Sequence, residues 1–229
     1  SGNAYTGEEG YVGLRRGILQ GQYNSWSQGS SCMKVAASDN IVVFRASEVA
    51  FLRAEGALRG WNMGGSPKDL YEAGIRLSFE ENNISSGVES YLANTGKVEG
   101  YKDPLKGQSG QTYDYSGSIN TAVTVAWAGG DFEKSLEQII TQKWIANFPN
   151  GMESWSEYRR TGYPKLMPMA ANASSGIVDD TEGARRMPYP TDEYRENKES
   201  VEAAVLTLTQ ESKTKKGDSM ATHVWWDCK

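Results

Sequence analysis

Glu153 and Glu157 lie four residues apart in a segment with the pattern of a short helix. This spacing places two carboxylates on one helix face, where they could act as an acid–base pair for glycoside hydrolysis. Glu157 is also followed by Arg160 three residues later, and Glu–Arg pairs are common on exposed helices. Catalytic carboxylates usually come from different elements that face each other across a cleft. We therefore expect a non-enzyme, and keep a helical glycoside hydrolase using Glu153 or Glu157 as an alternative.

An acidic loop and two arginine pairs are the other charged groups that could do chemistry. They are Asp179, Asp180 and Glu182, with Arg159-Arg160 and Arg185-Arg186. The loop could offer oxygens to calcium, but it lacks the alternating donors and central glycine of an EF-hand, which favours a solvated loop. The arginines could bind an anion, yet arginines beside aromatic residues more often stack on them and tie loops to helices. We predict neither a metal nor a cofactor.

The remaining composition excludes several function classes. His223 is the single histidine, which rules out multi-histidine metal sites. A net charge of -5 without a long basic run argues against binding nucleic acid. Cys32 and Cys228 are too far apart for a zinc ribbon or a redox pair, so two separate thiols are favoured over a disulfide. The longest aliphatic or aromatic run is residues 41–44, too short to span a membrane.

Seven tryptophans, twelve tyrosines and five phenylalanines stand against that one histidine. Those at helical spacing are predicted to pack in the interior: Phe51, Trp61, Tyr71, Phe79, Trp144 and Trp155. Six others lie in irregular segments: Tyr23, Trp26, Tyr101, Tyr113, Tyr115 and Trp127. An aromatic ring in a loop offers a flat apolar face to the C–H side of a pyranose, while nearby amides and carboxylates bind the hydroxyls. We predict these six as candidate ligand-binding residues.

The spacing of apolar residues and the helix caps predict a mainly α chain, in which helical hairpins position these residues. We expect a single domain over 1–229, divided into an irregular lead-in (1–40), a helical hairpin (41–81), a long loop region (82–130), a second hairpin (131–162), and an irregular segment with a helix and tail (163–229). The caps predicted for the first hairpin are Ser47 and Ser66, the latter followed by Pro67 at the first helical position. Hairpins of this kind build tetratricopeptide arrays.

Asp131 is predicted to cap the first helix of the second hairpin. Six apolar residues of that helix are expected on one face: Phe132, Leu136, Ile139, Ile140, Trp144 and Phe148. A further helix is expected from about Asn197 to Leu208, with Val201 and Val205 aligned.

Several long stretches resemble the SusD/RagB family of nutrient-binding lipoproteins. They are residues 46–61 (ASEVAFLRAEGALRGW) and 70–80 (LYEAGIRLSFE), 136–146 (LEQIITQKWIA) and 155–164 (WSEYRRTGYP), 185–190 (RRMPYP) with Glu193-Tyr194, and the closing Trp225-Trp226-Asp227. They occur in the family's order from about residue 41 to the end.

The resemblance implies more than spacing does. Family members are mostly helical with tetratricopeptide-like pairs, are lipid-anchored on the extracellular face of the outer membrane, and bind oligosaccharides or, in some branches, peptides. They deliver these to a SusC-like TonB-dependent transporter and do not cleave them. Members are about twice this length, so the chain is expected to be a C-terminal portion, which would explain why it begins without a signal or lipid-attachment cysteine. A protein-binding adaptor without sugar affinity remains an alternative.

Overall fold

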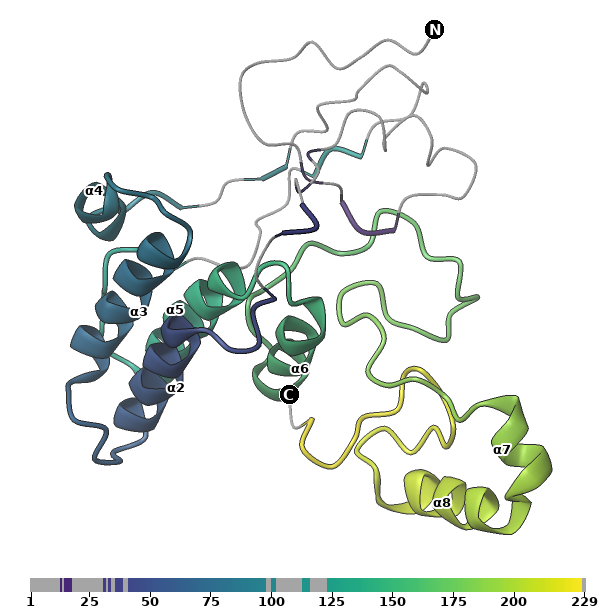
Figure 1. Cartoon of the computed structure of the whole chain (residues 1–229). Helices are drawn as coiled ribbons and strands as arrows, with labels where there is room; N and C mark the ends of the chain where they lie inside the picture. The colour runs from purple at the N-terminus through teal and green to yellow at the C-terminus, as the bar shows by residue number, and fades with distance from the viewer. Residues whose placement is uncertain are drawn as a thin grey trace, which may run out of the picture. The chain divides into compact units, whose positions relative to one another are not determined.

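The computed structural model describes residues 13, 15–17, 31, 33, 36–38, 41–97, 100, 101, 113–115 and 123–227. The chain divides into two compact units, one of residues 35–99 and 118–165 and the other of 1–34, 100–117 and 166–229. The described parts of both contain helices and no strand longer than an isolated bridge, which confirms the predicted mainly α class (Figure 1). No described helix is long and apolar enough to cross a membrane.

The first hairpin consists of α2 (Ala46–Leu58) and α3 (Pro67–Glu81), which lie side by side in Figure 1. The hydroxyl oxygen of Ser66 accepts the backbone N–H of Asp69, as its predicted capping role requires. The predicted cap at Ser47 is wrong, because α2 begins one residue earlier. Ser47 instead donates its backbone N–H and its hydroxyl to the carboxylate of Glu81, at 2.9 and 2.6 Å, joining the start of α2 to the end of α3.

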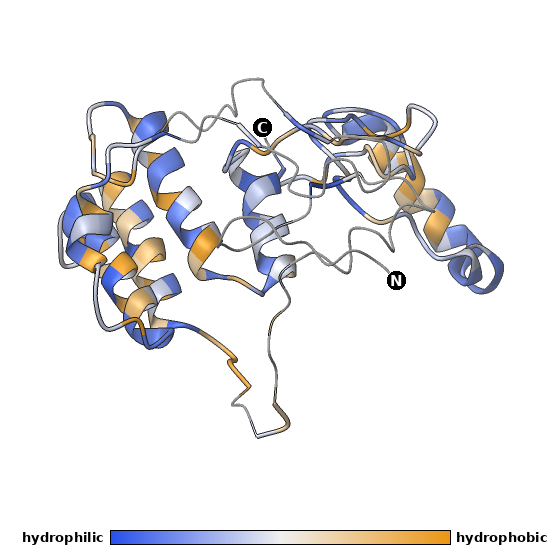
Figure 2. Ribbon diagram, turned by 90° about the horizontal axis from the view of Figure 1, so that it is seen from above, coloured by the Kyte–Doolittle hydropathy of each residue, from blue (hydrophilic) through white to orange (hydrophobic). Residues whose placement is uncertain are grey.

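The interior of this hairpin is a cluster of apolar side chains shared with the second hairpin. Its buried members are Phe51, Ala54, Leu70, Tyr71, Ile75, Ile139 and Ala146. The helices approach closely because Gly74 lacks a side chain, and a Cβ there would lie 2.7 Å from the Phe51 ring. Hydrophobic and hydrophilic residues are interleaved along the helices in Figure 2, as expected for helices with one packed side.

The second hairpin consists of α5 (Phe132–Ala146) and α6 (Gly151–Thr161). Asp131 accepts the backbone N–H of Lys134 at 2.8 Å, which confirms the predicted cap. Gly162 ends α6 with a φ of 74°, a conformation that favours glycine.

The predicted apolar face of α5 is only partly buried. Leu136, Ile139 and Ile140 are in the interior, but Trp144 and Phe148 are 38% and 66% exposed. The buried face of α5 instead includes three polar residues, Gln138, Gln142 and Lys143. Their side chains form hydrogen bonds with other residues of the same unit. Packing was also predicted for Trp61, and this is wrong: the residue is 62% exposed because α2 ends at Leu58, before the helical pattern reaches it.

Two short helices were not predicted. The long loop region contains α4 (Val88–Leu92), and α7 (Thr191–Glu196) precedes α8 (Lys198–Glu211) in the other unit. The helix expected from about Asn197 to Leu208 is confirmed as α8, which continues three residues further. Val201 is the buried residue of α8.

Candidate functional site

The four loop aromatics that the structure describes are divided between the two units. Tyr23 and Trp26 lie outside the described residues, as do Cys32 and Cys228, so their predictions stay open. Tyr101, Tyr113 and Tyr115 belong to the unit that contains the two ends of the chain, and Trp127 belongs to the unit of the two hairpins.

Tyr101 and Tyr115 are paired through their backbones. Each donates its N–H to the carbonyl oxygen of the other, at 3.0 and 2.8 Å, in an isolated antiparallel bridge. The Tyr101 hydroxyl donates to the carbonyl of Gly13 at 3.1 Å. Both rings are half-buried, so each retains an accessible part.

Arg15 holds this tyrosine segment in place. Its guanidinium lies 5.1 Å from the centre of the Tyr115 ring, a cation–π distance, and its Nη1 donates to the carbonyls of Tyr113 and Asp114 at 3.1 and 3.2 Å. Nε and Nη2 also donate to the carbonyl of Pro168 at 3.3 and 3.1 Å. Tyr113 is buried, which makes it an anchor of the loop, whereas Tyr101 and Tyr115 are better placed to contact a ligand.

Trp127 forms one wall of a hollow of about 420 Å³ in the unit of the two hairpins. Its ring centre lies 5.1 Å from that of Tyr71, and Trp127 is half-buried. The remaining walls mix apolar and polar residues: Leu58, Ser66, Pro67, Lys68, Gly129, Gly130, Asp131, Phe132 and Ser135. An aromatic wall close to hydroxyl, ammonium and carboxylate groups can bind a polar molecule that has one apolar face, as a sugar has.

Gln138 and Tyr71 position the segment that carries Trp127. The buried side-chain amide of Gln138 donates to the carbonyls of Thr124 and Ala126, at 2.8 and 2.9 Å, and its oxygen accepts the N–H of Ala128 at 3.2 Å. The Tyr71 hydroxyl donates to the carbonyl of Val125 at 2.7 Å, and burial raises the pKa of this phenol. Gln138 was not predicted from the sequence. An amide side chain at a core-facing position of a helix is the pattern that would have indicated its role.

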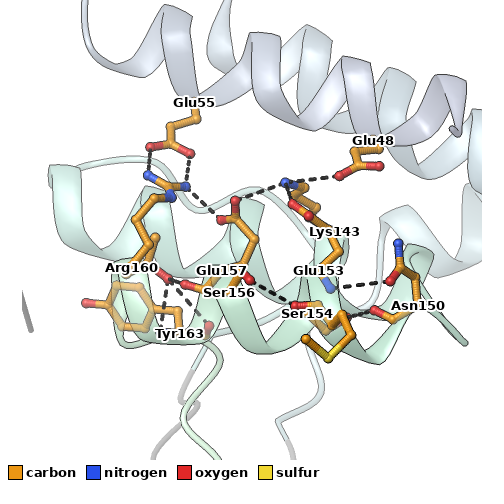
Figure 3. Close-up of polar contacts among 12 residues, drawn as sticks. Glu48, Glu55, Lys143, Asn150, Glu153, Ser154, Ser156, Glu157, Arg160 and Tyr163 are labelled. Atoms are coloured by element: carbon orange, nitrogen blue, oxygen red, sulfur yellow. Dashed lines mark hydrogen bonds and ion pairs between the residues drawn. The ribbon is translucent and has the colours of Figure 1, made fainter. Parts of the chain in front are cut away.

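Glu153 and Glu157 share one cation, the ammonium of Lys143 (Figure 3). Lys143 Nζ lies 3.4 Å from Glu153 and 3.0 Å from Glu157, and 3.4 Å from Glu48 on α2. The Lys143 side chain is only 1% exposed, and of its three partners Glu153 alone is substantially exposed, at 38%. These contacts join α5, α6 and α2.

Arg160 extends this network to Glu55 (Figure 3). Its Nη1 and Nη2 donate to the two carboxylate oxygens of Glu55 at 2.8 and 2.6 Å, and Nη2 also donates to Glu157 at 2.7 Å. Burial acts to raise the pKa of Glu55, but hydrogen bonds and positive charge from Arg160 and Arg59 outweigh it, so this pKa lies below its usual value. A general acid needs the opposite shift, and these contacts favour an ion-pair network that holds helices together.

The other charged groups singled out in the sequence have structural contacts. The guanidinium of Arg159 lies 3.5 Å from the Trp155 ring centre, and Arg186 lies 4.9 Å from that of Tyr189. These contacts match the predicted stacking roles.

Arg185 forms a buried ion pair with Asp227, and Arg186 pairs with Asp218. Asp179 accepts the backbone N–H groups of Thr181 and Glu182 within its own loop. Within the described parts of the chain, no cluster of three histidine, cysteine or acidic side chains is placed to hold a metal ion.

Comparison with known proteins identifies one family that the chain resembles over most of its length. A family model described as SusD-like, "Susd and RagB outer membrane lipoprotein", matches residues 1–227. No curated protein sequence matches the chain.

Solved structures give close relatives. A SusD homologue from Bacteroides ovatus is 89% identical, with a TM-score of 0.91, over 100% of this chain and 46% of its own length. One from Bacteroides thetaiotaomicron is 47% identical, with a TM-score of 0.85, over 97% of this chain and 46% of its own. A chitin-binding SusD homologue from Flavobacterium johnsoniae is 42% identical, with a TM-score of 0.82, over 96% and 43%. The chain thus spans less than half the length of each relative.

Proposed function

Because the chain belongs to the SusD-like family of outer-membrane lipoproteins, we propose that it binds an oligosaccharide without cleaving it. The family match over residues 1–227 carries the proposal, and the chitin-binding relative supports a glycan as the class of ligand. The proposed location is the extracellular face of the outer membrane, with attachment through a lipid anchor. The bound glycan would then pass to a SusC-like TonB-dependent transporter.

The aromatic residues of the described chain support glycan binding. The Trp127 hollow combines an aromatic wall with Ser66, Lys68 and Asp131, groups that donate and accept hydrogen bonds. Tyr101 and Tyr115 offer a second place for sugar contact in the other unit. A binding protein needs such platforms and no proton donor.

The ion-pair network supports the non-catalytic part of the proposal. A glycosidase needs one carboxyl that stays protonated near neutral pH and a partner across the sugar. Glu153 and Glu157 instead share Lys143, and Glu157 also pairs with Arg160. Both carboxylates lie on the same helix, α6, so they do not face each other across a bound sugar.

Isothermal titration of the chain with cellohexaose, maltohexaose and chitohexaose tests the proposal. We expect saturable heat with one or more of these glycans, and no new reducing ends after prolonged incubation. Reducing ends that form with the wild type and vanish in Glu157→Gln would establish the hydrolase instead. Absence of binding to every glycan, with binding to a peptide, would overturn the glycan assignment.

The transporter requires a separate experiment. We expect the protein to co-purify from outer membranes with a TonB-dependent transporter identified by mass spectrometry. Co-purification by a protein that binds none of the three hexaoses would favour the adaptor alternative.

A further inference from the structure

A second hollow lies in the unit of the two hairpins, at the end of α2. Its volume is about 470 Å³, and it is lined by Leu52, Glu55, Gly56, Arg59, Trp61, Glu157 and Arg160. It combines an exposed indole with both hydrogen-bond donors and acceptors. Neither the candidate site above nor the family match assigns it a role.

The Trp61 ring packs against α2 at Gly56 and provides an aromatic surface for a ligand. Its backbone N–H donates to the carbonyl of Gly56 at 2.9 Å. A Cβ at Gly56 would lie 3.3 Å from Trp61 Cε3 and 2.9 Å from Met63 Cγ, so a glycine is needed where the ring rests on the helix. The side chain is nevertheless 62% exposed, which leaves ring surface open to a ligand. An exposed indole on a fixed backbone loses little conformational entropy on binding.

The charged side chains that line the hollow are held in place by ion pairs with one another. Two arginines, Arg59 and Arg160, face two glutamates, Glu55 and Glu157, so the formal charges cancel. Arg59 donates Nε and Nη2 to Glu55 at 3.0 and 2.8 Å, while its Nη1 bonds to no residue that the structure describes. Balanced charges suit a neutral ligand that both donates and accepts hydrogen bonds, which describes the hydroxyls of a neutral sugar.

The second hollow lies next to the Trp127 hollow, because a residue that lines one contacts a residue that lines the other. Arg59 lines the second hollow, and its guanidinium lies 5.4 Å from the ring centre of Phe132, which lines the first. Leu58, the neighbour of Arg59 in the chain, also lines the first. The aromatic platforms Trp61 and Trp127 are thus on hollows that adjoin across the Arg59–Phe132 stack.

We propose that the two hollows form one groove that binds successive neutral hexopyranose units of a single glycan, with one unit stacked on Trp61. This inference rests on the proposed glycan-binding function and adds to it the place, the charge class and the minimum length of the ligand. A glycan long enough to occupy both hollows would bind more tightly than a short one, because the second unit then binds within the same molecule.

The test compares Trp61→Ala with wild-type chain in titrations with the three hexaoses and with cellobiose, maltose and diacetylchitobiose. We expect the variant to bind the preferred hexaose about 10- to 30-fold more weakly, the range for loss of an aromatic anchor. Binding of the matching disaccharide in the Trp127 hollow should change much less. Trp225→Ala is the control: this indole is 90% exposed but lies in the other unit, and its loss should leave hexaose affinity within about twofold.

A second readout does not depend on the stability of the variant. The seven tryptophans give indole N–H signals in a 15N-labelled sample, and Trp61→Phe identifies that of Trp61. We expect this signal to move when the preferred hexaose is added. Unchanged hexaose affinity in Trp61→Ala with an unmoved Trp61 signal would overturn the groove while leaving the glycan function intact. Failure of the wild type to bind any hexaose would refute both.

Discussion

Replacing Lys143 with methionine should strongly destabilise the unit of the two hairpins. Methionine keeps most of the apolar volume of the lysine stem but removes the charge. The ammonium lies between Glu48, Glu153 and Glu157, at 3.4, 3.4 and 3.0 Å. The variant therefore tests whether the network in Figure 3 stabilises the fold.

The expected magnitude follows from which carboxylates lose their partner. Glu157 keeps Arg160, and Glu153 is partly exposed, so both retain some compensation. Glu48 is buried, and Lys143 is the only cation that pairs with it among the described residues. Leaving one buried charge unpaired costs about 3–5 kcal/mol. This is a large part of a total unfolding free energy of about 5–15 kcal/mol.

Urea denaturation followed by circular dichroism measures the loss. With an m value of about 2 kcal/mol/M, a cost of 4 kcal/mol lowers the midpoint by about 2 M. Lys68→Met is the matched control, because Lys68 pairs with Glu72 at 3.7 Å on the surface and should cost less than about 1 kcal/mol. Equal losses in the two variants would refute the reasoning.

Two further predictions concern packing and pH. Gly74→Ala places a methyl group 2.7 Å from the Phe51 ring and should destabilise by about 1–3 kcal/mol in urea, whereas Gly151→Ala, with open space at its Cβ, should not; equal stability of the two variants would contradict this. The pKa of Glu55 is lowered in the folded chain, so its contribution is complete above its ordinary value of 4.5 and is lost as the pH falls through the lowered value. The urea midpoints of wild type and Glu55→Gln should therefore converge as the pH falls below about 4.5, and a constant difference would show that the ionised carboxylate is not the cause.

Local signals in the sequence predicted the helices well. Ser66 with Pro67, and Asp131, mark helix starts that the structure contains, because a cap depends on neighbours within three residues. Ser47 was misread because its partner, Glu81, lies 34 residues away on another helix. A capping residue and a residue that joins two helices have the same local pattern.

The candidate site was less predictable, because exposure depends on where helices end and what packs on them. Trp61 continues the apolar spacing of α2 but lies beyond its last turn, so the spacing indicated burial where the structure has an exposed ring. Gln138 and Lys143 are polar residues in a buried stripe, and their partners come from distant segments. The ligand contacts of Tyr101, Tyr115 and Trp127 stay predictions.

A protein that binds glycans without cleaving them retains a glycan and releases it unchanged. Equilibrium dialysis of the chain against chitohexaose, cellohexaose and maltohexaose, followed by chromatography of both compartments, measures retention and integrity together. We predict that at least one hexaose accumulates on the protein side and is recovered at its original length. Shorter oligosaccharides would contradict binding without cleavage, and equal concentrations of all three on both sides would contradict glycan binding itself.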